Sequence, residues 1–231
     1  MALAVSCSPI RKYPKGNYLL VSNKLVMNKN TIDASELKSL FKQKPNKKNL
    51  GLYLNIRFWN YAGKGKETGF KRWIKKTLAA EPVLLDTSLI PGSLNQINYY
   101  LNNHGYFNSD ISHTVIYPKK NRRNARIIFN VRTHAPYKIN KVSYSISDAT
   151  LKAFVYSEKK DCRLVPGEIY NIDNIDAERD RITRTLRNNG YYSFSREYIT
   201  FAIDSSLNSH QVDIRIKISD VLAPAENRPD S

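Results

Sequence analysis

The sequence predicts an α+β protein made of two tandem β-α-α-β-β domains, each a three-stranded sheet packed by two helices. Two observations predict this class: a motif that recurs 85 residues later, and a change from helical to strand-like apolar spacing after each copy. A chain of 231 residues, with 41% hydrophobic and 25% charged residues, is ordinary globular material. Its length has room for two domains of about 100 residues each.

The recurring motif reads LNNHGYF at Leu101–Phe107 and LRNNGYY at Leu186–Tyr192. Upstream of it, apolar residues spaced seven and four apart mark one face of a helix in both copies. These positions are Ile90, Ile97 and Leu101 in the first copy and Ile175, Ile182 and Leu186 in the second. We expect each helix to end at the glycine of the motif, in the left-handed position that favours this residue.

Alternating apolar and polar residues predict a hairpin after each of these helices, and a strand and a shorter helix before it. The expected elements of the first copy are a strand at Tyr18–Asn28, a helix at Asp33–Lys44, and hairpin strands at Ile111–Tyr117 and Ala125–Thr133. Those of the second copy are a strand at Tyr137–Ile146, a helix at about Asp148–Ser157, and hairpin strands at Tyr198–Asp204 and Gln211–Ser219.

The two copies also predict the domain boundaries. Their opening strands match at a spacing of 119 residues, so the first copy carries an insertion, which we place at about 46–81. We expect a lipoprotein-like start and extended tether at 1–15, a first domain at 16–136, a second domain at 137–220 and a linker at 221–231.

This order of elements, with a second helix that ends in Asn-x-Gly-Tyr-Phe/Tyr, resembles POTRA domains. They are the periplasmic modules that precede the barrel in outer-membrane assembly proteins of the BamA/TamA type, and the stretch at 43–51 resembles Bacteroidetes members. The family motif is carried by Gly105, Tyr106 and Phe107, and by Gly190, Tyr191 and Tyr192. The resemblance implies a periplasmic, outer-membrane-associated scaffold that is not an enzyme and needs no cofactor. It also implies a C-terminal barrel in the parent protein, beyond the linker and absent from this chain.

The first seven residues, MALAVSC, form a small apolar run that ends at a cysteine. This pattern resembles the end of a lipoprotein signal, whose cysteine is lipidated after cleavage. Bacteroidetes members of the family tend to begin in this way. Cys7 is therefore a lipidation candidate, and the alternative is an unmodified cysteine in an ordinary apolar N-terminus.

Family topology places the last strand of each copy at the centre of its sheet and the first hairpin strand at an edge. An unpaired edge offers N–H and C=O groups to an extended chain. We predict that these edges bind unfolded outer-membrane protein clients or an accessory envelope protein; the alternative is an edge that is only solvated or covered. The predicted contact residues are Ile111, His113, Val115 and Tyr117 in the first copy and Tyr198, Thr200 and Ala202 in the second.

The insertion is rich in basic and aromatic residues. Residues 47–76 hold nine basic side chains, one acidic side chain and both tryptophans. We expect Phe70, Trp73, Ile74 and Leu78 to share one face of a helix. The pattern suits an anionic membrane surface or an acidic partner protein; alternatively, the aromatic side chains pack on the domain. The candidate surface residues are Arg57, Trp59, Lys71, Arg72, Trp73, Lys75 and Lys76.

The net charge of +17 lies in one half of the chain. Residues 1–136 hold 23 of the 37 basic and 6 of the 20 acidic residues, whereas residues 137–231 hold 14 of each. RNA binding is therefore an alternative function, with Arg122, Arg123 and Arg126 as candidate phosphate contacts. The neutral second copy and the lack of an RNP-like or GXXG motif argue against nucleic acid as the partner.

Nothing in the sequence predicts catalysis. The four histidines lack metal-ligand spacing, and no nucleophile elbow or phosphate-binding loop is present. Acidic residues at 173–180 fit the start of a helix, where the helix dipole favours negative charge. We expect Cys162 to be a structural thiol.

Overall fold

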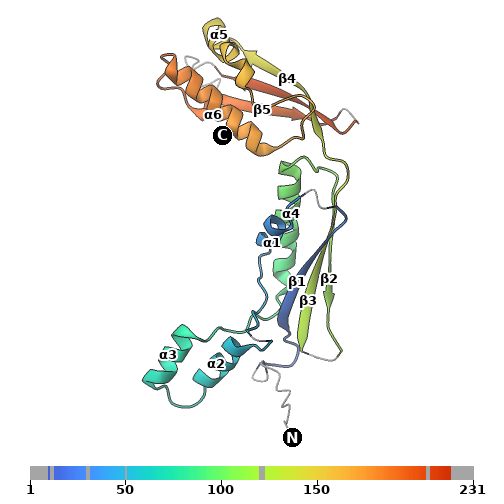
Figure 1. The fold of residues 1–231 in the computed structure, drawn as a ribbon, viewed down its shortest axis with the longest axis vertical. Helices are drawn as coiled ribbons and strands as arrows, with labels where there is room; N and C mark the ends of the chain where they lie inside the picture. The colour runs from blue at the N-terminus through green and yellow to red at the C-terminus, as the bar shows by residue number, and fades with distance from the viewer. Residues whose placement is uncertain are drawn as a thin grey trace. The chain divides into compact units, whose positions relative to one another are not determined.

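The computed structural model describes residues 10, 13–29, 32–49, 51–119, 123–206 and 209–219, and it confirms the α+β class. The chain divides into two compact units (Figure 1). The first unit comprises Met1–Asn98 and Asp110–Arg132. The second comprises Tyr99–Ser109 and Thr133–Ser231. Cys7 and the linker at 221–231 lie outside the described residues, so lipidation and the barrel that the linker was expected to precede stay predictions.

The first unit contains a three-stranded sheet in the order β1-β3-β2. Its strands are β1 (Leu19–Met27), β2 (Asp110–Ile116) and β3 (Asn124–Arg132). The central strand, β3, runs parallel to β1 and antiparallel to β2. Its alternate residues Ala125, Ile127, Phe129 and Val131 are buried. They face the layer formed by α1 (Ala34–Ser39) and α4 (Ile90–Asn103), on one side of the sheet (Figure 1). The last residues of α4, from Tyr99 on, are counted with the second unit.

The helix α1 is shorter than the predicted Asp33–Lys44. It begins after Asp33, whose side chain accepts a hydrogen bond from the Ser35 N–H, and it ends at Ser39. Beyond it, the Phe41 ring turns inward and stacks on Phe129, with ring centroids 4.3 Å apart. After this inward turn the chain runs beside β1, where the Asn23 side chain donates to the Gln43 carbonyl at 2.7 Å.

The second unit repeats this architecture with the strand order β4-β6-β5. Its strands are β4 (Lys138–Ile146), β5 (Ile199–Asp204) and β6 (Gln211–Ile218), and its helices are α5 (Ala149–Ser157) and α6 (Ile172–Asn188). Short 3-10 turns lie at η1 (Thr87–Leu89) in the first unit and at η2 (Lys159–Asp161) and η3 (Arg196–Tyr198) in the second. The core joins alternate residues of β6 to one face of α6, and it includes Val212, Ile214, Ile216, Ile175, Ile182 and Leu186.

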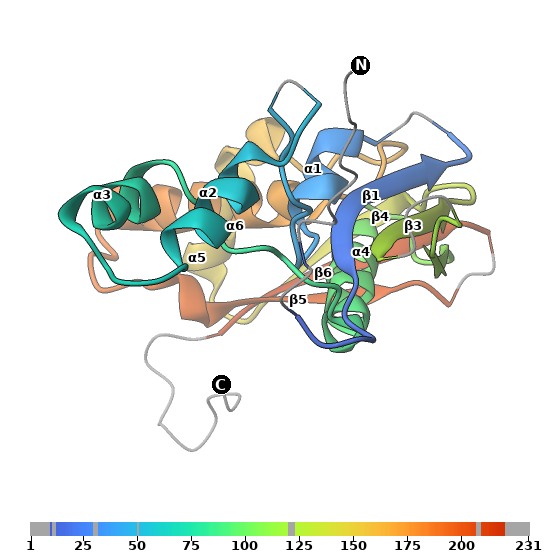
Figure 2. The ribbon, with the colours of Figure 1, turned by 90° about the horizontal axis from the view of Figure 1, so that it is seen from below.

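The insertion forms two helices, α2 (Leu54–Ala62) and α3 (Gly69–Thr77), which lie side by side (Figure 2). A helix over α3 was predicted, although Leu78 is its C-cap and not part of it. The helix α2 was not predicted. Its buried Ile56 packs with Leu19 of β1 and with Ile10, and this small cluster holds the insertion on the first unit.

Candidate interaction surfaces

Each sheet has one blunted edge strand, meaning an edge strand that carries a bulge and is partly covered by another segment. In the first unit, the Leu20 N–H donates to the Val83 carbonyl (3.0 Å), and the Leu85 N–H donates to the Tyr18 carbonyl (2.7 Å). The Asn46 side chain links the same two segments, because its amide donates to the carbonyls of Leu20 and Val83. A register shift between Leu20 and Ser22 adds a bulge. A bulge and a covering chain are two ways to protect an edge from strand pairing.

The second unit protects β4 in the same way. The Ile139 N–H donates to the Glu168 carbonyl (2.8 Å), and the Gly167 N–H donates to the Ile139 carbonyl (2.7 Å). The register of β4 shifts between Ile139 and Lys141, which is the position of the β1 bulge moved by 119 residues. In both copies, therefore, the segment that precedes the second helix crosses the start of the opening strand.

The opposite edge strands, β2 and β5, have neither device. Within the described residues, β2 pairs only with β3 and β5 pairs only with β6, and neither pairing contains a register shift. No hydrogen bond between the outer edge of Ile111–Ile116 and another described segment is present. The first hairpin strand of each copy therefore presents a regular row of backbone groups.

The predicted edge residues fall on different faces in the two copies. Ile111, His113 and Val115 lie opposite the buried residues Val131, Phe129 and Ile127 of β3, on the helix-covered face. Thr200 and Ala202 lie opposite the exposed residues Lys217 and Arg215 of β6, on the open face. The structural equivalents of Ile111 and His113 are Phe201 and Ile203, because η3 shifts β5 relative to the 85-residue repeat.

Two of the predicted edge residues lie outside the strands. Tyr117 follows the end of β2, and its ring contacts the Tyr18 ring at a centroid distance of 4.5 Å. Tyr198 belongs to η3, which turns through a hydrogen bond from the Tyr198 N–H to the Ser195 carbonyl. Neither side chain is placed on an edge strand, so the edge itself is limited to β2 and β5.

The insertion exposes aromatic rings among cations. Ile74 of α3 is buried, but Phe70 and Trp73 are 63% and 53% exposed, and their rings stack with centroids 6.0 Å apart. Trp59 is half-buried, and the Lys75 ammonium lies over its ring at 5.2 Å. The alternative that the aromatic side chains pack on the domain therefore does not fit Phe70 and Trp73, whose rings are exposed.

The cations of the insertion differ in their partners. Lys71 donates to the backbone carbonyls of Lys64 and Lys66. Arg72 forms an exposed ion pair with Glu67 at 3.4 Å. Arg57, Lys75 and Lys76 are exposed to solvent.

Among the described candidate phosphate contacts, Arg123 has structural partners. The Arg123 guanidinium donates to the backbone carbonyls of Ile10, Tyr13 and Pro14 at 2.7–3.0 Å, and it thereby holds the segment before β1. Arg122 lies outside the described residues, and Arg126 is exposed on β3. Arg123, which lies between them in the sequence, therefore has a structural role.

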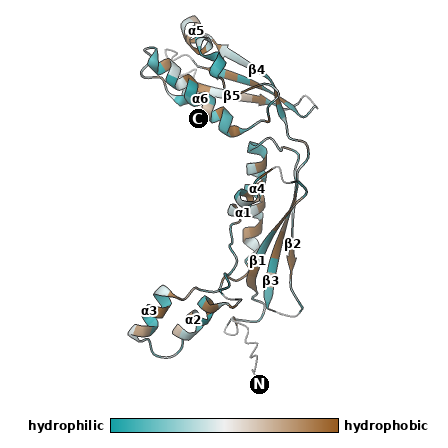
Figure 3. Ribbon diagram, in the orientation of Figure 1, coloured by the Kyte–Doolittle hydropathy of each residue, from teal (hydrophilic) through white to brown (hydrophobic). Residues whose placement is uncertain are grey.

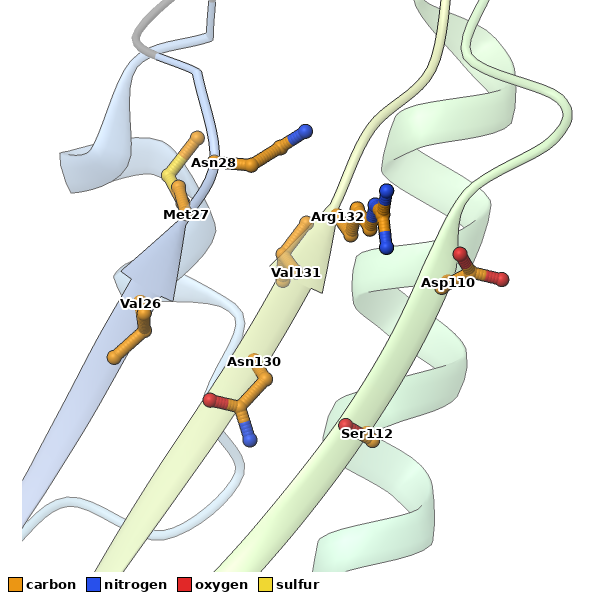
Figure 4. A pocket seen from close by; sticks show the side chains of 8 residues that line it. All are labelled: Val26, Met27, Asn28, Asp110, Ser112, Asn130, Val131 and Arg132. Atoms are coloured by element: carbon orange, nitrogen blue, oxygen red, sulfur yellow. The ribbon is translucent and has the colours of Figure 1, made fainter.

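A cavity of about 400 Å³ lies where the ends of β1, β2 and β3 meet. Its lining mixes Val26 and Met27 with Asn130, Ser112 and Arg132, from all three strands (Figure 4). It was not predicted from the sequence. In the described part of the chain, no three His, Cys, Asp or Glu side chains gather as a metal site would require. No described helix is both long and apolar enough to cross a membrane.

The second unit contains a buried charged cluster that the sequence did not predict. Glu178 is 0% exposed, and its carboxylate accepts two hydrogen bonds from the Arg181 guanidinium at 2.7 and 3.0 Å. The same carboxylate accepts from the Tyr144 hydroxyl (3.1 Å) and from the Arg163 N–H (3.1 Å). A carboxylate with four donors is fully satisfied. Glu178 therefore belongs to the core, and the helix dipole is not its main partner.

Cys162 borders this cluster, where its Sγ lies 3.5 Å from the Tyr144 hydroxyl and shares the hydroxyl proton with Glu178. Burial raises the pKa of the Cys162 thiol, and burial together with the hydrogen bond to Cys162 raises the pKa of Tyr144. Burial alone would lower the pKa of Arg181, but its hydrogen bond to Glu178 leaves that pKa raised. A neutral thiol beside a fixed ion pair suits packing and not nucleophilic attack.

The two family-motif glycines end their helices identically. The N–H of Gly105 donates to the Asn102 carbonyl and that of Tyr106 to the Leu101 carbonyl; Gly190 and Tyr191 repeat both bonds with Arg187 and Leu186. These pairs form the Schellman motif, in which the glycine is left-handed, with φ of +83° and +97°. The predicted helix ends are thus confirmed.

The surroundings of the two motifs differ. A Cβ on Gly105 would lie 2.8 Å from the Tyr170 carbonyl oxygen, whereas a Cβ on Gly190 would have no neighbour within 4 Å. Tyr106 is buried, and the Phe107 ring contacts the rings of Tyr137 and Tyr170. Tyr191 is half-buried, but Tyr192 is 82% exposed. The motif near Gly105 is therefore packed against Tyr137 and Tyr170 of the second unit.

One family model matches a large part of the second unit. Residues 137–220 match the model of the POTRA family, described as a surface antigen variable number repeat. A search of curated proteins finds no match.

Solved structures that resemble the chain include POTRA3-5 of Haemophilus influenzae BamA, at 16% identity and a TM-score of 0.44, with 90% of this chain and 68% of that chain covered. POTRA1-2 of the periplasmic domain of Anabaena Omp85 is 11% identical, with a TM-score of 0.38. The match covers 89% of this chain and 98% of that chain. Haemophilus ducreyi BamA lacking POTRA domains 1-3 is 15% identical, with a TM-score of 0.43. The match covers 88% of this chain and 29% of that chain, so this chain spans less than a third of that protein's length.

Proposed function

Residues 137–220 form a POTRA domain, and on this premise we propose that the chain is a periplasmic scaffold of an outer-membrane protein assembly or translocation factor. It binds extended segments of unfolded outer-membrane clients, or of an accessory envelope protein, by strand addition. The first unit contributes a second site of the same kind, because its strand order is that of the second unit. The mechanism is binding and positioning, without covalent chemistry.

One observation carries this proposal: in each sheet the opening strand is blunted and the first hairpin strand is regular and uncovered. Strand addition uses main-chain hydrogen bonds, which do not depend on the sequence of the incoming segment. In an antiparallel edge strand, alternate residues direct their N–H and C=O groups outward. A regular edge therefore suits a scaffold that receives many different clients.

We expect β2 to be the stronger acceptor. Its residues are exposed except for the half-buried Ile111 and Val115, so an incoming strand meets little obstruction. In β5, by contrast, Ile199 is buried and the Arg179 guanidinium lies 5.0 Å from the centre of the Phe201 ring. The difference predicts that a single extended peptide occupies the first unit before the second.

A pair of proline substitutions tests strand addition. Successive N–H groups of β2 point alternately toward β3 and outward. Thr114→Pro and Val115→Pro are therefore two separate variants with different effects. In one of them proline removes a backbone hydrogen bond to β3, and in the other it removes only an N–H group that points away from the sheet. Circular dichroism identifies the variant that keeps the native fold. In that variant, we expect binding of a labelled, uncharged ten-residue peptide of alternating valine and threonine to fall at least tenfold.

Hydrogen–deuterium exchange supplies a second readout. Peptide binding should protect the backbone amides of Ile111–Ile116 in the unsubstituted protein, because added main-chain bonds slow their exchange. The matched control is Ser112→Ala, which alters an exposed β2 side chain and leaves the backbone donors intact. If the folded proline variant binds the peptide as tightly as this control, strand addition at β2 is wrong.

A further inference from the structure

We propose that the insertion binds an anionic lipid surface through α3. The rings of Phe70 and Trp73 enter the interface between head groups and acyl chains, and nearby cations contact lipid phosphates. This contact is separate from strand addition at β2, and it uses no residue of that edge.

The first argument is that α3 is anchored without its two exposed aromatic residues. Ile74 is 5% exposed, and Ile56 of α2, at 2% exposed, joins the cluster with Leu19 and Ile10. The orientation of α3 therefore does not require Phe70 or Trp73 to be covered by protein. Their rings lie parallel, at an angle of 18°, and form one solvent-facing apolar pair.

The second argument is the arrangement of charge around that pair. Phe70, Trp73 and Lys76 are spaced three residues apart, so they lie along one side of α3. The helix holds four basic residues and no acidic residue (Figure 3 shows hydrophilic and apolar positions interleaved along it). Arg72 and the buried Ile74 are two residues apart, so they lie on opposite sides of α3. Cations thus border the aromatic pair where an inserted ring would meet head groups.

The third argument favours lipid over an acidic protein. Within α3 itself, the exposed large apolar side chains are the rings of Phe70 and Trp73, on a helix of nine residues. Two rings are a small apolar area beside a specific protein interface of about 1,200–2,000 Å². Tryptophan beside lysine and arginine on a short amphipathic helix is the composition of an interfacial membrane contact. Long basic side chains can also keep their charge at the head groups while their stems stay in contact with apolar groups.

The experiment uses the full chain and vesicles of phosphatidylcholine with or without 30% phosphatidylglycerol, a composition that sets the charge. We expect sedimentation with the anionic vesicles at low salt, and weaker sedimentation as ionic strength rises. The double variant Phe70→Ser/Trp73→Ser should reduce binding at least tenfold. Its matched control is Tyr192→Ser, which removes an exposed aromatic ring from the second unit.

Charge is tested in the same way. Arg72→Gln/Lys76→Gln should weaken binding more than Lys141→Gln/Lys160→Gln, which removes two exposed charges from the second unit. In a Trp59→Phe background, Trp73 is the sole tryptophan, and its emission should shift to the blue on anionic vesicles and be quenched by brominated lipid.

Absence of binding at low salt overturns the proposal. Two results taken together also overturn it: the aromatic double variant binds as tightly as the unsubstituted protein, and Trp73 emission in the Trp59→Phe background does not shift. They would mean that charge alone attracts the protein to the vesicles. Full displacement by soluble polyglutamate, with no quenching by brominated lipid, would point instead to an acidic protein as the partner.

Discussion

Gly105 and Gly190 separate two reasons for a glycine: a left-handed backbone, which both positions have, and lack of space for a Cβ, which applies only to Gly105. Both glycines are left-handed and end their helices with the same pair of hydrogen bonds. Alanine at either position must adopt a conformation that costs about 1–2 kcal/mol. The loss of chain entropy in the unfolded state offsets about 0.4–1 kcal/mol of this cost. Gly190→Ala should therefore destabilise the protein by about 0–1.6 kcal/mol.

Gly105→Ala adds a steric conflict. Its Cβ would lie 2.8 Å from the Tyr170 carbonyl oxygen and 3.2 Å from the Tyr137 carbonyl oxygen. Both neighbours are backbone atoms, so they cannot move aside as a flexible side chain would. Forcing an extra carbon into a packed site costs typically about 1–3 kcal/mol. We therefore expect Gly105→Ala to lower the free energy of unfolding by about 1–3 kcal/mol more than Gly190→Ala does.

Urea unfolding followed by circular dichroism measures the total effect, and amide exchange of β4 locates it in the second unit. Asparagine supplies the internal control, because it tolerates the left-handed conformation but still carries a Cβ. Gly190→Asn should recover most of the loss seen with alanine, whereas Gly105→Asn should not. If the alanine variants differ by less than about 0.5 kcal/mol, which is the usual limit of additivity, the steric argument is wrong.

Three further predictions concern buried or structural groups. Glu178→Gln should destabilise the second unit by about 3–5 kcal/mol in thermal or urea unfolding, because it leaves the Arg181 guanidinium buried without an opposite charge; a smaller loss than that of an exposed control such as Glu197→Gln would contradict this. Arg123→Met should speed limited proteolysis within residues 10–17, since their carbonyls lose its guanidinium donors, and unchanged cleavage would refute the role assigned to Arg123. Because its pKa is raised, Cys162 should react with iodoacetamide more slowly at pH 8.5 than a cysteine in an unstructured peptide; the gap should close in urea, as peptide mass spectrometry can follow, and equal rates in the native state would contradict the burial argument.

The features that sequence predicted correctly are those encoded locally. The Asn-x-Gly ending of each second helix is a local signal, so the helix ends at Gly105 and Gly190 were found. The alternation along β3 and β6 was equally clear, because these central strands bury one face along their length.

The features that sequence missed depend on contacts between distant residues. The helix α2 begins at Leu54 without a side-chain cap, and its stable position comes from the contact of Ile56 with Leu19. The position of β5 was misjudged at Tyr198, because η3 interrupts the repeat before the strand. The covering of β1 by the segment near Val83 is a pairing of backbone groups, which leaves no signature in residue type.

The asymmetry of the sheet edges also limits how copies of this chain can associate. Two copies that paired through their β2 strands would form one continuous six-stranded sheet. Each outer end of that sheet would be a β1 strand, with its bulge and its crossing segment. Growth would stop at this pair, because no regular edge would remain in the joined sheet. A fold that leaves one regular edge strand uncovered is thereby protected against extension of the same sheet into a fibre.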